Sequence, residues 1–316
     1  MRILSPVDRR AEVGELADAG ADELYGGYVS GDWRRKYSLL SSVNHRYFPS
    51  AQIGGLNELK GIVKDAHGRG LRFYITMNAP YYTGPQYEDI LSDAARYIDM
   101  GVDAFIVADL GLVLRLAHIM PGFPVHLSTL GTVFNSKGAA FFSHLGVNRV
   151  VLPRELTVRE MAGIIKANPG TEFDAFVMIG KCPNIEGFCS FTHNSPSLIW
   201  PCEEAYTFGT VKTDGRAEEI ARAQAGWGSV NRRQACGLCA VRALDQAGVT
   251  ALKVVGRGGP TAVKVKVVKA VRDMLDYSPG RAEVRLELQT KAKAVYKELF
   301  GRECSPYVCY FPEVWR

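Results

Sequence analysis

The sequence predicts an α/β protein of the TIM-barrel type: a (β/α)8 domain with a cysteine-rich segment and two C-terminal helices. An amphipathic helix, a glycine and a short apolar strand recur in that order through the first two thirds of the chain, and such alternation is typical of a parallel sheet. The 316 residues are 47% hydrophobic and 22% charged, enough to bury a large core. No GxGxxG follows the first strand and no Walker motif occurs, which disfavours the alternative, an open nucleotide-binding sheet.

The repeating units can be placed in order along the chain. A first helix begins at about Asp8, and apolar positions at helical spacing predict two more within residues 56–66 and 87–98. Another helix follows Thr157, which forms a capping box with Glu160. The expected strands are Glu23–Gly26, Phe73–Asn78, Ala104–Asp109, Val125–Thr129, Arg149–Leu152, Phe173–Ile179, one within residues 247–257 and, where room remains for an eighth, one between Tyr206 and Asn231.

Two helices are expected after the last of these units, at about Thr261–Tyr277 and Ala282–Phe300. We therefore divide the chain into two parts. Residues 1–260 form the barrel and include the cysteine-rich segment 181–239. Residues 261–316 form the C-terminal helices and a tail packed on the barrel.

Charge and hydropathy restrict the setting in which the protein works. The chain has 38 basic and 33 acidic residues and a net charge of +5. This charge suits an anionic small molecule, a membrane surface or RNA without selecting one. The N-terminal residues mix acids and bases and lack an apolar signal segment, and no apolar run reaches the roughly 18 residues that cross a bilayer. We expect a cytoplasmic protein with reduced thiols and no membrane span.

Cysteines are concentrated late in the chain. None of the seven precedes Cys182, and Cys182, Cys189, Cys202 and Cys236 are separated by 6, 12 and 33 residues. Four thiolates can hold an iron–sulfur cluster or a zinc ion. The wide spacing favours iron–sulfur, because zinc sites prefer close pairs, and in the segment 181–239 only Cys236–Cys239 is such a pair. The alternative is buried cysteines that pack as small hydrophobes. Three remain for core thiols, a pair or a second site: Cys239, Cys304 and Cys309.

A glycine-rich turn follows the last expected strand. In LKVVGRGGPTAV, residues 252–263, Gly256 leads toward a helix N-terminus, with Lys253 and Arg257 close by. Backbone N–H groups at such a turn favour an anion, and barrels often bind phosphate at this position. The turn therefore predicts a ligand-binding site for an anion. The alternative is a tight connection with a solvated arginine.

Polar residues also gather where the expected strands end. Asp109 ends one strand, Arg154 and Glu155 follow another, and His126 and Ser128 alternate along a third and so share a face. Because the active sites of barrels lie at the carboxyl ends of the strands, we expect a shared pocket. The ordinary alternatives are a satisfied core histidine and solvated surface charges. The candidate catalytic residues are Asp109, His126, Asn135, Arg154 and Glu155.

Several stretches together resemble peptidase family U32. They occur in the order of the family and cover most of the chain from residue 20 to about residue 277. The long LGVNRVVLPREL run and the cysteine-bearing segment that ends in AGVTALKVVGR are the most specific. The matching stretches are ADELYGG (21–27), VADLG (107–111), HLSTLGTVFN (126–135), LGVNRVVLPREL (145–156), the run 181–202 and AGVTALKVVGR (247–257).

The resemblance implies a barrel-like α/β fold and a 4Fe–4S cluster held by Cys182, Cys189, Cys202 and Cys236. It also implies oxygen-independent hydroxylation of an RNA base or of a ubiquinone precursor, since most studied members of the family are not simple proteases. The spacing from Cys182 to Cys189 resembles that of the short members of ubiquinone biosynthesis, which work as heterodimers. A second U32-family subunit, or a homodimer, is therefore an expected partner.

The same resemblance implies an anionic organic hydroxyl compound, such as prephenate, as the oxygen donor. Its carboxylates would suit Arg154, Lys253 and Arg257, since arginine binds carboxylate with two parallel hydrogen bonds. The chain departs from the family at two positions, where Leu130 replaces a common glutamine and Val255 a common glutamate. These departures put the identity of the substrate in doubt.

Other classes of function stay open at this point. A peptidase would need a nucleophile and a base, and His193 lies close in sequence to Cys189, although HExxH and GxSxG are both absent. A non-catalytic iron–sulfur subunit of a heterodimer is a further alternative. RNA is a conceivable partner, but the short basic runs of the sequence give it no support.

Overall fold

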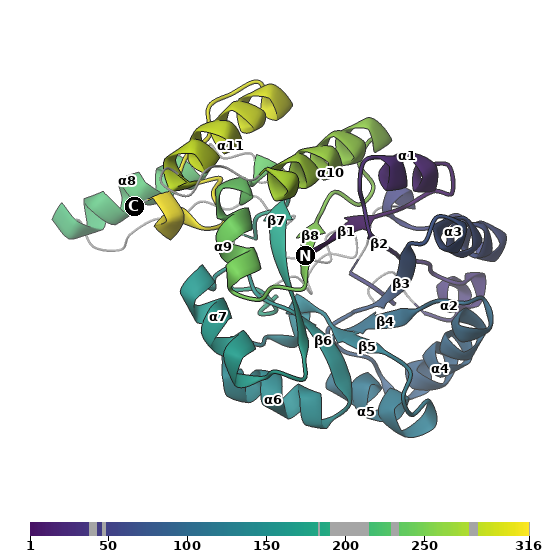
Figure 1. Ribbon diagram of the computed structural model, residues 1–316. Coiled ribbons are helices and arrows are strands. Elements are labelled where there is room, and N and C mark those ends of the chain that lie inside the picture. Colours follow the sequence, from purple (N-terminus) through teal and green to yellow (C-terminus); the bar gives the residue numbers. More distant parts are fainter. Residues whose placement is uncertain are drawn as a thin grey trace.

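Eight parallel strands close into a barrel in sequence order, and helices surround it (Figure 1). The computed structural model describes residues 1–37, 43–45, 49–182, 184–189, 215–228, 234–277 and 284–315. The TIM-barrel-like fold predicted from the sequence is confirmed. The strands are β1 (Arg2–Pro6), β2 (Glu23–Gly26), β3 (Arg72–Met77), β4 (Ala104–Val107), β5 (Val125–Leu127), β6 (Val147–Val151), β7 (Glu172–Met178) and β8 (Ala251–Val254).

Helices alternate with the strands and begin with local capping signals. The capping box predicted at Thr157 is confirmed. Thr157 Oγ1 accepts a hydrogen bond from the backbone amide of Glu160, and the carboxylate of Glu160 accepts one from the backbone amide of Thr157. The helices are α1 (Glu12–Asp18), α2 (Gly31–Lys36), α3 (Leu56–Gly68), α4 (Gly84–Asp99), α5 (Leu110–Ile119), α6 (Ser136–His144), α7 (Val158–Ala167), α8 (Gly215–Gly228), α9 (Val241–Gln246), α10 (Thr261–Asp276) and α11 (Val284–Phe300).

Two apolar cores lie on opposite faces of the barrel wall. On β3, Phe73 and Ile75 belong to the large core that also contains the apolar faces of the helices. Tyr74, between them, belongs to a small core inside the barrel. This alternation follows from the strand period of two residues, which points neighbouring side chains to opposite faces. The inner core consists of Leu4, Tyr25, Tyr74, Ala104, Ile106 and Ala251.

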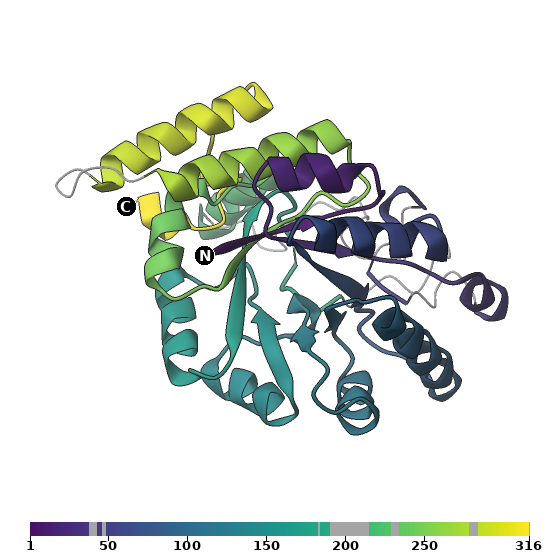
Figure 2. The same cartoon turned by 45° about the vertical axis from the view of Figure 1, so that its right-hand side comes forward.

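The first of the two C-terminal helices packs on β1 and α1, and the second packs on the first. Helix α10 contacts α1 and β1, and α11 contacts α10 and the short 3-10 helix η5 (Leu238–Ala240). Figure 2 shows α11 lying along the outer side of α10. Among the described residues, no helix has the length and apolar character needed to cross a membrane.

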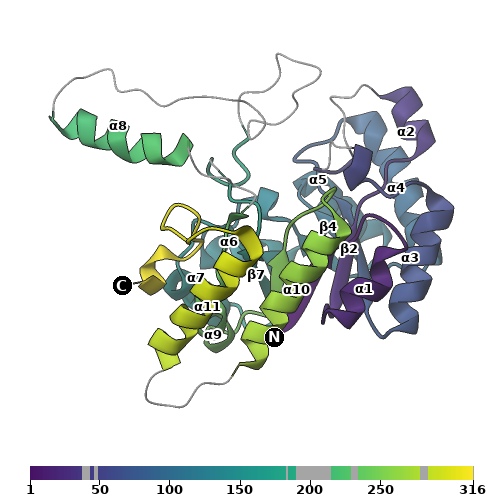
Figure 3. The same cartoon turned by 90° about the horizontal axis from the view of Figure 1, so that it is seen from above.

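The strand that closes the barrel is β1, which pairs with both β2 and β8. We expected the eighth strand between Tyr206 and Asn231, and that prediction is wrong. Where this stretch is described, residues 215–228 form α8, which stands away from the barrel (Figure 3). Strand β1 gives a weak sequence signal because it is short, ends at Pro6 and is buried on both faces, so it lacks alternating polarity.

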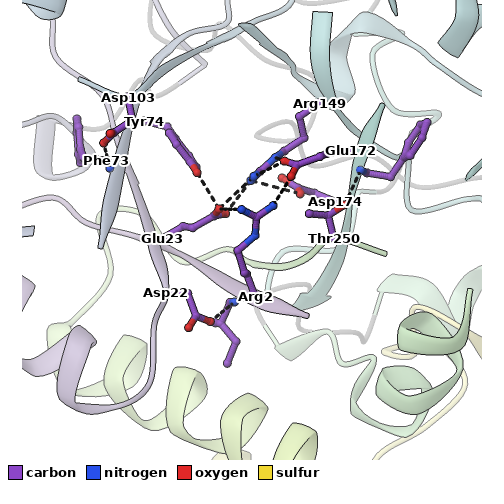
Figure 4. A network of polar contacts seen from close by, with 12 residues as sticks. Arg2, Asp22, Glu23, Phe73, Tyr74, Asp103, Arg149, Glu172, Asp174 and Thr250 are labelled. Atoms are coloured by element: carbon purple, nitrogen blue, oxygen red, sulfur yellow. Dashed lines mark hydrogen bonds and ion pairs between the residues drawn. The ribbon is translucent and has the colours of Figure 1, made fainter. Parts of the chain in front are cut away.

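Charged residues fill the end of the barrel where the strands begin (Figure 4). Arg149 of β6 is only 1% exposed and donates to both carboxylate oxygens of Glu23, at 2.7 and 3.0 Å. Its Nε donates to Glu172 at 2.7 Å, and Arg2 Nη2 reaches the same carboxylate at 2.7 Å. The hydroxyl of Tyr74 donates to Glu23 at 2.7 Å. Two arginines and two glutamates thus neutralise one another inside the fold.

Asp174 lies at the edge of this network without sharing in its hydrogen bonds. Its side chain is fully buried, and within the described residues neither carboxylate oxygen has a hydrogen-bond partner. Arg149 Nη1 lies 3.7 Å from Asp174 Oδ1. Burial raises the pKa of Asp174 to about 6, although Arg149 opposes the shift. A carboxyl in this environment favours its neutral form more than an exposed one does.

Candidate functional site

A pocket of about 200 Å³ opens at the other end of the barrel, where the strands finish. Residues in or directly after seven strands, β2 to β8, contribute to its wall, which is the position at which barrels carry their active sites. The volume is below the usual range for drug-sized ligands, so the pocket suits one nucleobase or one small organic acid. Its strand-end residues include Tyr25, Asn78, Ser128, Arg154, Phe176 and Lys253.

The described wall of this pocket is electropositive. Four cationic side chains line it, and they come from different segments: Arg154, Lys181, Lys253 and Arg257. Glu186 is the carboxylate among the described lining residues. An excess of positive charge around a concave surface attracts anionic ligands.

Arg154 is held firmly in the pocket wall. Its guanidinium group forms an ion pair with Glu186 and lies 3.5 Å from the centre of the Phe176 ring. Glu186 also accepts the backbone amide of Arg154 at 2.8 Å and the hydroxyl of Thr129 at 3.2 Å. Glu155 points elsewhere: it is exposed, and its carboxylate accepts the amide of Glu186 at 3.0 Å. Glu155 therefore supports the segment that carries Glu186 and does not line the pocket.

Two lysines complete the cationic wall. Lys253 is only 6% exposed, and its Nζ lies 4.3 Å from the centre of the Tyr25 ring. Lys181 donates to the backbone carbonyls of Tyr307 at 3.0 Å and Cys309 at 2.9 Å. Burial lowers the pKa of Lys181. The C-terminal tail thus positions one cation of the pocket.

A chain of neutral polar groups crosses the mouth. The backbone amide of His45 donates to Asn78 Oδ1 at 3.1 Å, and Asn78 Nδ2 donates to Ser128 Oγ at 3.1 Å. Burial lowers the pKa of His45 well below its ordinary value, and the positive charges of Arg257 and Arg154 lower it further. The imidazole is therefore neutral near pH 7 and can accept a hydrogen bond.

Three further candidate residues, besides Glu155, lie outside the pocket. Asp109 is the N-cap of α5, where Oδ1 accepts the amide of Leu112 at 2.6 Å and the hydroxyl of Tyr87 at 2.7 Å. Asn135 caps α6 in the same way. His126 is 5% exposed inside the barrel, edge-on to Tyr74 at 4.5 Å between ring centres. The pocket therefore contains Ser128 and Arg154 from the expected set but not these three residues.

The glycine-rich turn is partly occupied by the protein's own carboxylate. The amide of Gly258 donates to Asp8 Oδ2 at 2.7 Å, and Lys264 pairs with the same oxygen at 2.9 Å. Gly256 has φ +121°, a conformation that favours glycine. Asp8 thus satisfies an amide that we expected to meet an external anion, while Arg257 lines the mouth pocket.

The structure separates the cysteines of the proposed cluster. Cys182 and Cys189 line the mouth pocket. Cys236 lines a second cavity together with Cys239, Cys304 and Cys309. Cys202 lies outside the described residues, as does His193 of the peptidase alternative. In the described part of the chain, no three His, Cys, Asp or Glu side chains already stand where they could hold a metal ion.

Thiol chemistry differs between the two places. Burial raises the pKa of Cys236, and the neighbouring Cys239, Cys309 and Cys304 raise it further. Burial also raises the pKa of Cys239, to about 12. No disulfide joins the described cysteines. At neutral pH and without a bound metal, Cys236 and Cys239 are protonated thiols.

Several pocket residues were missed in the sequence. Asn78 follows β3 directly and Tyr25 lies near the end of β2. Their positions at expected strand ends could therefore have identified both from the sequence. Glu186 gives no such signal, because it follows a strand by several residues and is recognised only by its contact with Arg154. Leu130 and Val255, the two departures from the family pattern, both line the pocket.

The fold and this pocket define a (β/α)8-barrel protein with an electropositive site at the carboxyl ends of its strands. The sequence model of Peptidase family U32 matches residues 9–313. The chain therefore belongs to Peptidase family U32, as the resemblance predicted.

Curated relatives connect the family to RNA. The tRNA hydroxylation protein P of Escherichia coli K12 is 29% identical over 188 residues, which are 59% of this chain and 38% of that protein. The 23S rRNA 5-hydroxycytidine C2501 synthase of the same organism is 27% identical over 197 residues, or 61% of this chain and 26% of that enzyme. The chain thus matches less than half the length of these relatives.

A solved structure supports the fold independently. The U32 peptidase Mk0906 superposes with a TM-score of 0.50 at 15% identity, over 82% of this chain and 94% of that one. At this identity the likeness concerns the fold alone.

Proposed function

We propose that this protein hydroxylates a base of RNA and that the mouth pocket is its active site. The observation that carries the proposal is the electropositive pocket on a chain whose relatives are named for tRNA and rRNA hydroxylation. Positive charge attracts the phosphate backbone of RNA. The small volume then admits one base that has left its stack.

The pocket wall offers suitable contacts for an extruded base. Proteins recognise unstacked RNA bases by stacking on aromatic rings or guanidinium planes and by hydrogen bonds to base edges. Tyr25 supplies a ring, Arg154 a guanidinium plane held in place by Glu186, and Asn78 and Ser128 supply polar groups. The neutral imidazole of His45 can accept a hydrogen bond at the mouth.

The proposed reaction exchanges a hydroxyl group and a hydrogen without molecular oxygen. An anionic organic hydroxyl donor gives its hydroxyl to a base carbon and receives the hydrogen in return, so the base loses two electrons and the donor gains two. Lys253 and Arg257 bind the carboxylates of the donor, since both line the pocket. A quinone precursor in place of RNA would use the same exchange.

A 4Fe–4S cluster is part of the proposal for the mouth. Cys182 and Cys189 supply two thiols in the pocket wall, whereas Cys236 faces the second cavity. Two of the four proposed ligands, Cys182 and Cys189, therefore lie together in the wall of the mouth pocket. Such a cluster supplies one-electron transfer when bound. Iron and sulfide counts on anaerobically purified wild type and Cys182→Ala test this part: we expect both elements in the wild type and their loss in the variant.

The hydroxylation itself can be tested in cells. A host strain deleted for its tRNA hydroxylation protein P is supplied with wild type, Arg154→Met or the exposed control Arg159→Met, and its tRNA and rRNA nucleosides are analysed by mass spectrometry. We expect a hydroxylated nucleoside with the wild type and the control and its loss with Arg154→Met. If the wild type is folded and metal-loaded and adds no hydroxyl to either RNA, the proposal fails.

A further inference from the structure

The chain turns sharply where it leaves β7. Ile179, directly after the strand, has φ +63°, and Gly180 follows with φ +80°. Among the described residues that are not glycine, Thr132 is the only other one with a positive φ. A β-branched residue such as isoleucine rarely adopts this left-handed conformation, because its Cβ crowds the backbone. The conformation of Ile179 therefore persists because the surrounding structure enforces it.

This strained turn carries residues into the mouth pocket. Gly180 and the next two residues, Lys181 and Cys182, all line the pocket. A Cβ on Gly180 would lie 3.0 Å from Val255 Cγ1, so the turn leaves little room for a larger residue there. An extended backbone at Ile179 would send Lys181 in another direction. The strained conformation thus sets the place of one cation in the pocket wall.

Two later segments of the chain hold the backbone of Ile179. Its amide donates to the carbonyl of Ala235 at 2.8 Å, and its carbonyl accepts a hydrogen bond from the hydroxyl of Tyr310. Tyr310 is 4% exposed, and burial raises the pKa of its hydroxyl although Arg154 opposes the shift. The hydroxyl is therefore protonated and can donate. Since a buried carbonyl without a hydrogen bond is costly, this bond favours the strained conformation of Ile179.

The tail that carries Tyr310 also contacts two cations of the pocket. Lys181 Nζ donates to the carbonyls of Tyr307 at 3.0 Å and Cys309 at 2.9 Å. These carbonyls orient the ammonium group without neutralising its charge. The ring centre of Tyr310 lies 5.8 Å from the guanidinium carbon of Arg154, within the range of a cation–π contact. One short segment of the tail thus contacts both side chains.

The tail is anchored independently of these contacts. The amide of Cys236 donates to the carbonyl of Val308 at 2.8 Å, and the amide of Tyr310 donates to the carbonyl of Cys236 at 2.9 Å. Phe311, the next residue, is 2% exposed and belongs to the large core. The tail is therefore a fixed part of the fold, against which the turn after β7 can be held.

We propose that Tyr310 is a positioning residue of the mouth pocket: it holds Ile179 in its left-handed conformation and so places Lys181 where an anionic ligand binds. The proposal rests on the proposed function in one respect, that this ligand is the RNA substrate. The alternative is a buried tyrosine that stabilises the fold and has no effect on the pocket. In both cases Tyr310 acts through other residues and not on the reacting atoms.

Chemical labelling of Lys181 tests the proposal without reference to activity. The protein is treated with an amine-acetylating N-hydroxysuccinimide ester, and the acetylation of Lys181 is followed by mass spectrometry. The test variant Tyr310→Phe keeps the ring and removes the hydroxyl. We expect Lys181 to be labelled about fivefold faster than in the wild type, the change in population that corresponds to one hydrogen bond.

Tyr296→Phe is the matched control. Tyr296 is 1% exposed, and its hydroxyl has no hydrogen-bond partner among the described residues. The substitution therefore removes a hydroxyl from a tyrosine that is equally buried and that does not hold the turn. We expect the wild-type rate of Lys181 labelling in this variant.

A double variant separates positioning from stability. Glycine adopts a positive φ without the steric penalty of isoleucine, so Ile179→Gly/Tyr310→Phe should return the labelling of Lys181 toward the wild-type rate. A purely stabilising role predicts no such recovery, because the double variant loses further apolar contacts. The proposal is overturned by an unchanged labelling rate in Tyr310→Phe, by an equal increase in Tyr296→Phe, or by no recovery in the double variant.

Hydrogen exchange in the wild type covers the case in which Tyr310→Phe does not fold. The peptides that contain Ile179 and Tyr310 should lose their protection at the same denaturant concentration, because the hydroxyl–carbonyl bond joins them. Loss of protection at Ile179 while Tyr310 stays protected overturns the proposal.

Kinetics connect the positioning role to the reaction. For RNA hydroxylation we expect Tyr310→Phe to raise KM about fivefold and to leave kcat nearly unchanged, because a positioned cation acts on binding. A lower kcat at unchanged KM overturns the assignment. A wild type that does not hydroxylate RNA contradicts the proposed function and leaves the labelling and exchange results unaffected.

Discussion

The two ends of the barrel use charged residues in opposite ways. Where the strands begin, Arg149 and Arg2 are paired with Glu23 and Glu172 at hydrogen-bonding distance, and Arg149 is sealed from solvent. Where the strands end, the described pocket wall carries four cations and one carboxylate. The first arrangement neutralises charge inside the protein, and the second leaves an electropositive surface that an anionic ligand can neutralise.

The difference predicts which charges matter mainly for folding and which for ligand binding. Removing one partner of a buried ion pair is destabilising, because the other charge stays buried without compensation. A cation in an open pocket costs little to remove, because water solvates what remains. Stability should therefore respond to substitutions at the strand starts, and binding to substitutions at the strand ends.

The largest expected effect on stability is that of Arg149→Met. The substitution keeps the apolar length of the side chain but leaves Asp174 buried without its cation and Glu23 paired with Arg2 alone. We expect the free energy of unfolding to fall by about 3–5 kcal/mol, measured by denaturant titration. Arg257→Met in the mouth pocket is the matched control, and we expect it to change stability by less than about 1 kcal/mol. Equal losses of unfolding free energy in the two variants would contradict the proposed difference between the two ends of the barrel.

The pH dependence of stability should report Asp174. Its folded pKa of about 6 lies above the ordinary value of 3.8, so between these values the folded state holds a proton that the unfolded state has released. The contribution of Asp174 is therefore fully present below pH 4 and is lost as the pH rises through 6.

Asp174→Asn isolates this contribution. The unfolding free energy of the wild type, minus that of the variant, should fall from pH 4 to pH 6 and stay level above it. A flat difference would show that Asp174 has no raised pKa, and the strand-start network would then be ionised throughout. Denaturant titrations at several pH values give both curves.

Lys253→Met should lower activity more than stability, which is the reverse of the effect expected for Arg149→Met. The Nζ of Lys253 reaches the mouth over Tyr25, and loss of one charged contact to an anionic ligand costs about 1.5–3 kcal/mol. We expect kcat/KM for hydroxylation to fall about tenfold to a hundredfold, with a smaller loss of stability than in Arg149→Met. The exposed Lys269→Met is the control and should keep both values. An unchanged kcat/KM in Lys253→Met would remove this lysine from the site.

The sequence predicted the fold because helix and strand periods alternate clearly from β2 onward, and it missed β1 because a five-residue strand buried on both faces has no period to detect. It placed Arg154 in a pocket at the converging strand ends and Lys253 in the glycine-rich turn, and both residues line one pocket. The contact of Arg149 with Glu23, 126 residues away, has no local signal. Neither has the meeting of Cys236 with Cys309.

Strand-end position could not tell a pocket residue from a helix cap. Asp109 and Arg154 both follow strands, yet Asp109 turns back to the amide of Leu112, while Arg154 faces the cavity. Aspartate and asparagine serve equally as caps and as catalytic groups, so residue type does not decide between the two roles. Only the direction of the side chain does.

The smallest expected effect separates these two roles at Asp109. Asparagine also caps helices, whereas alanine cannot, so Asp109→Ala should lower the free energy of unfolding by about 1 kcal/mol and Asp109→Asn by only a few tenths. Denaturant titration measures both. If Asp109→Asn keeps its stability and loses hydroxylation, the carboxylate belongs to the catalytic set, and the functional end of the barrel extends beyond the pocket to the first turn of α5.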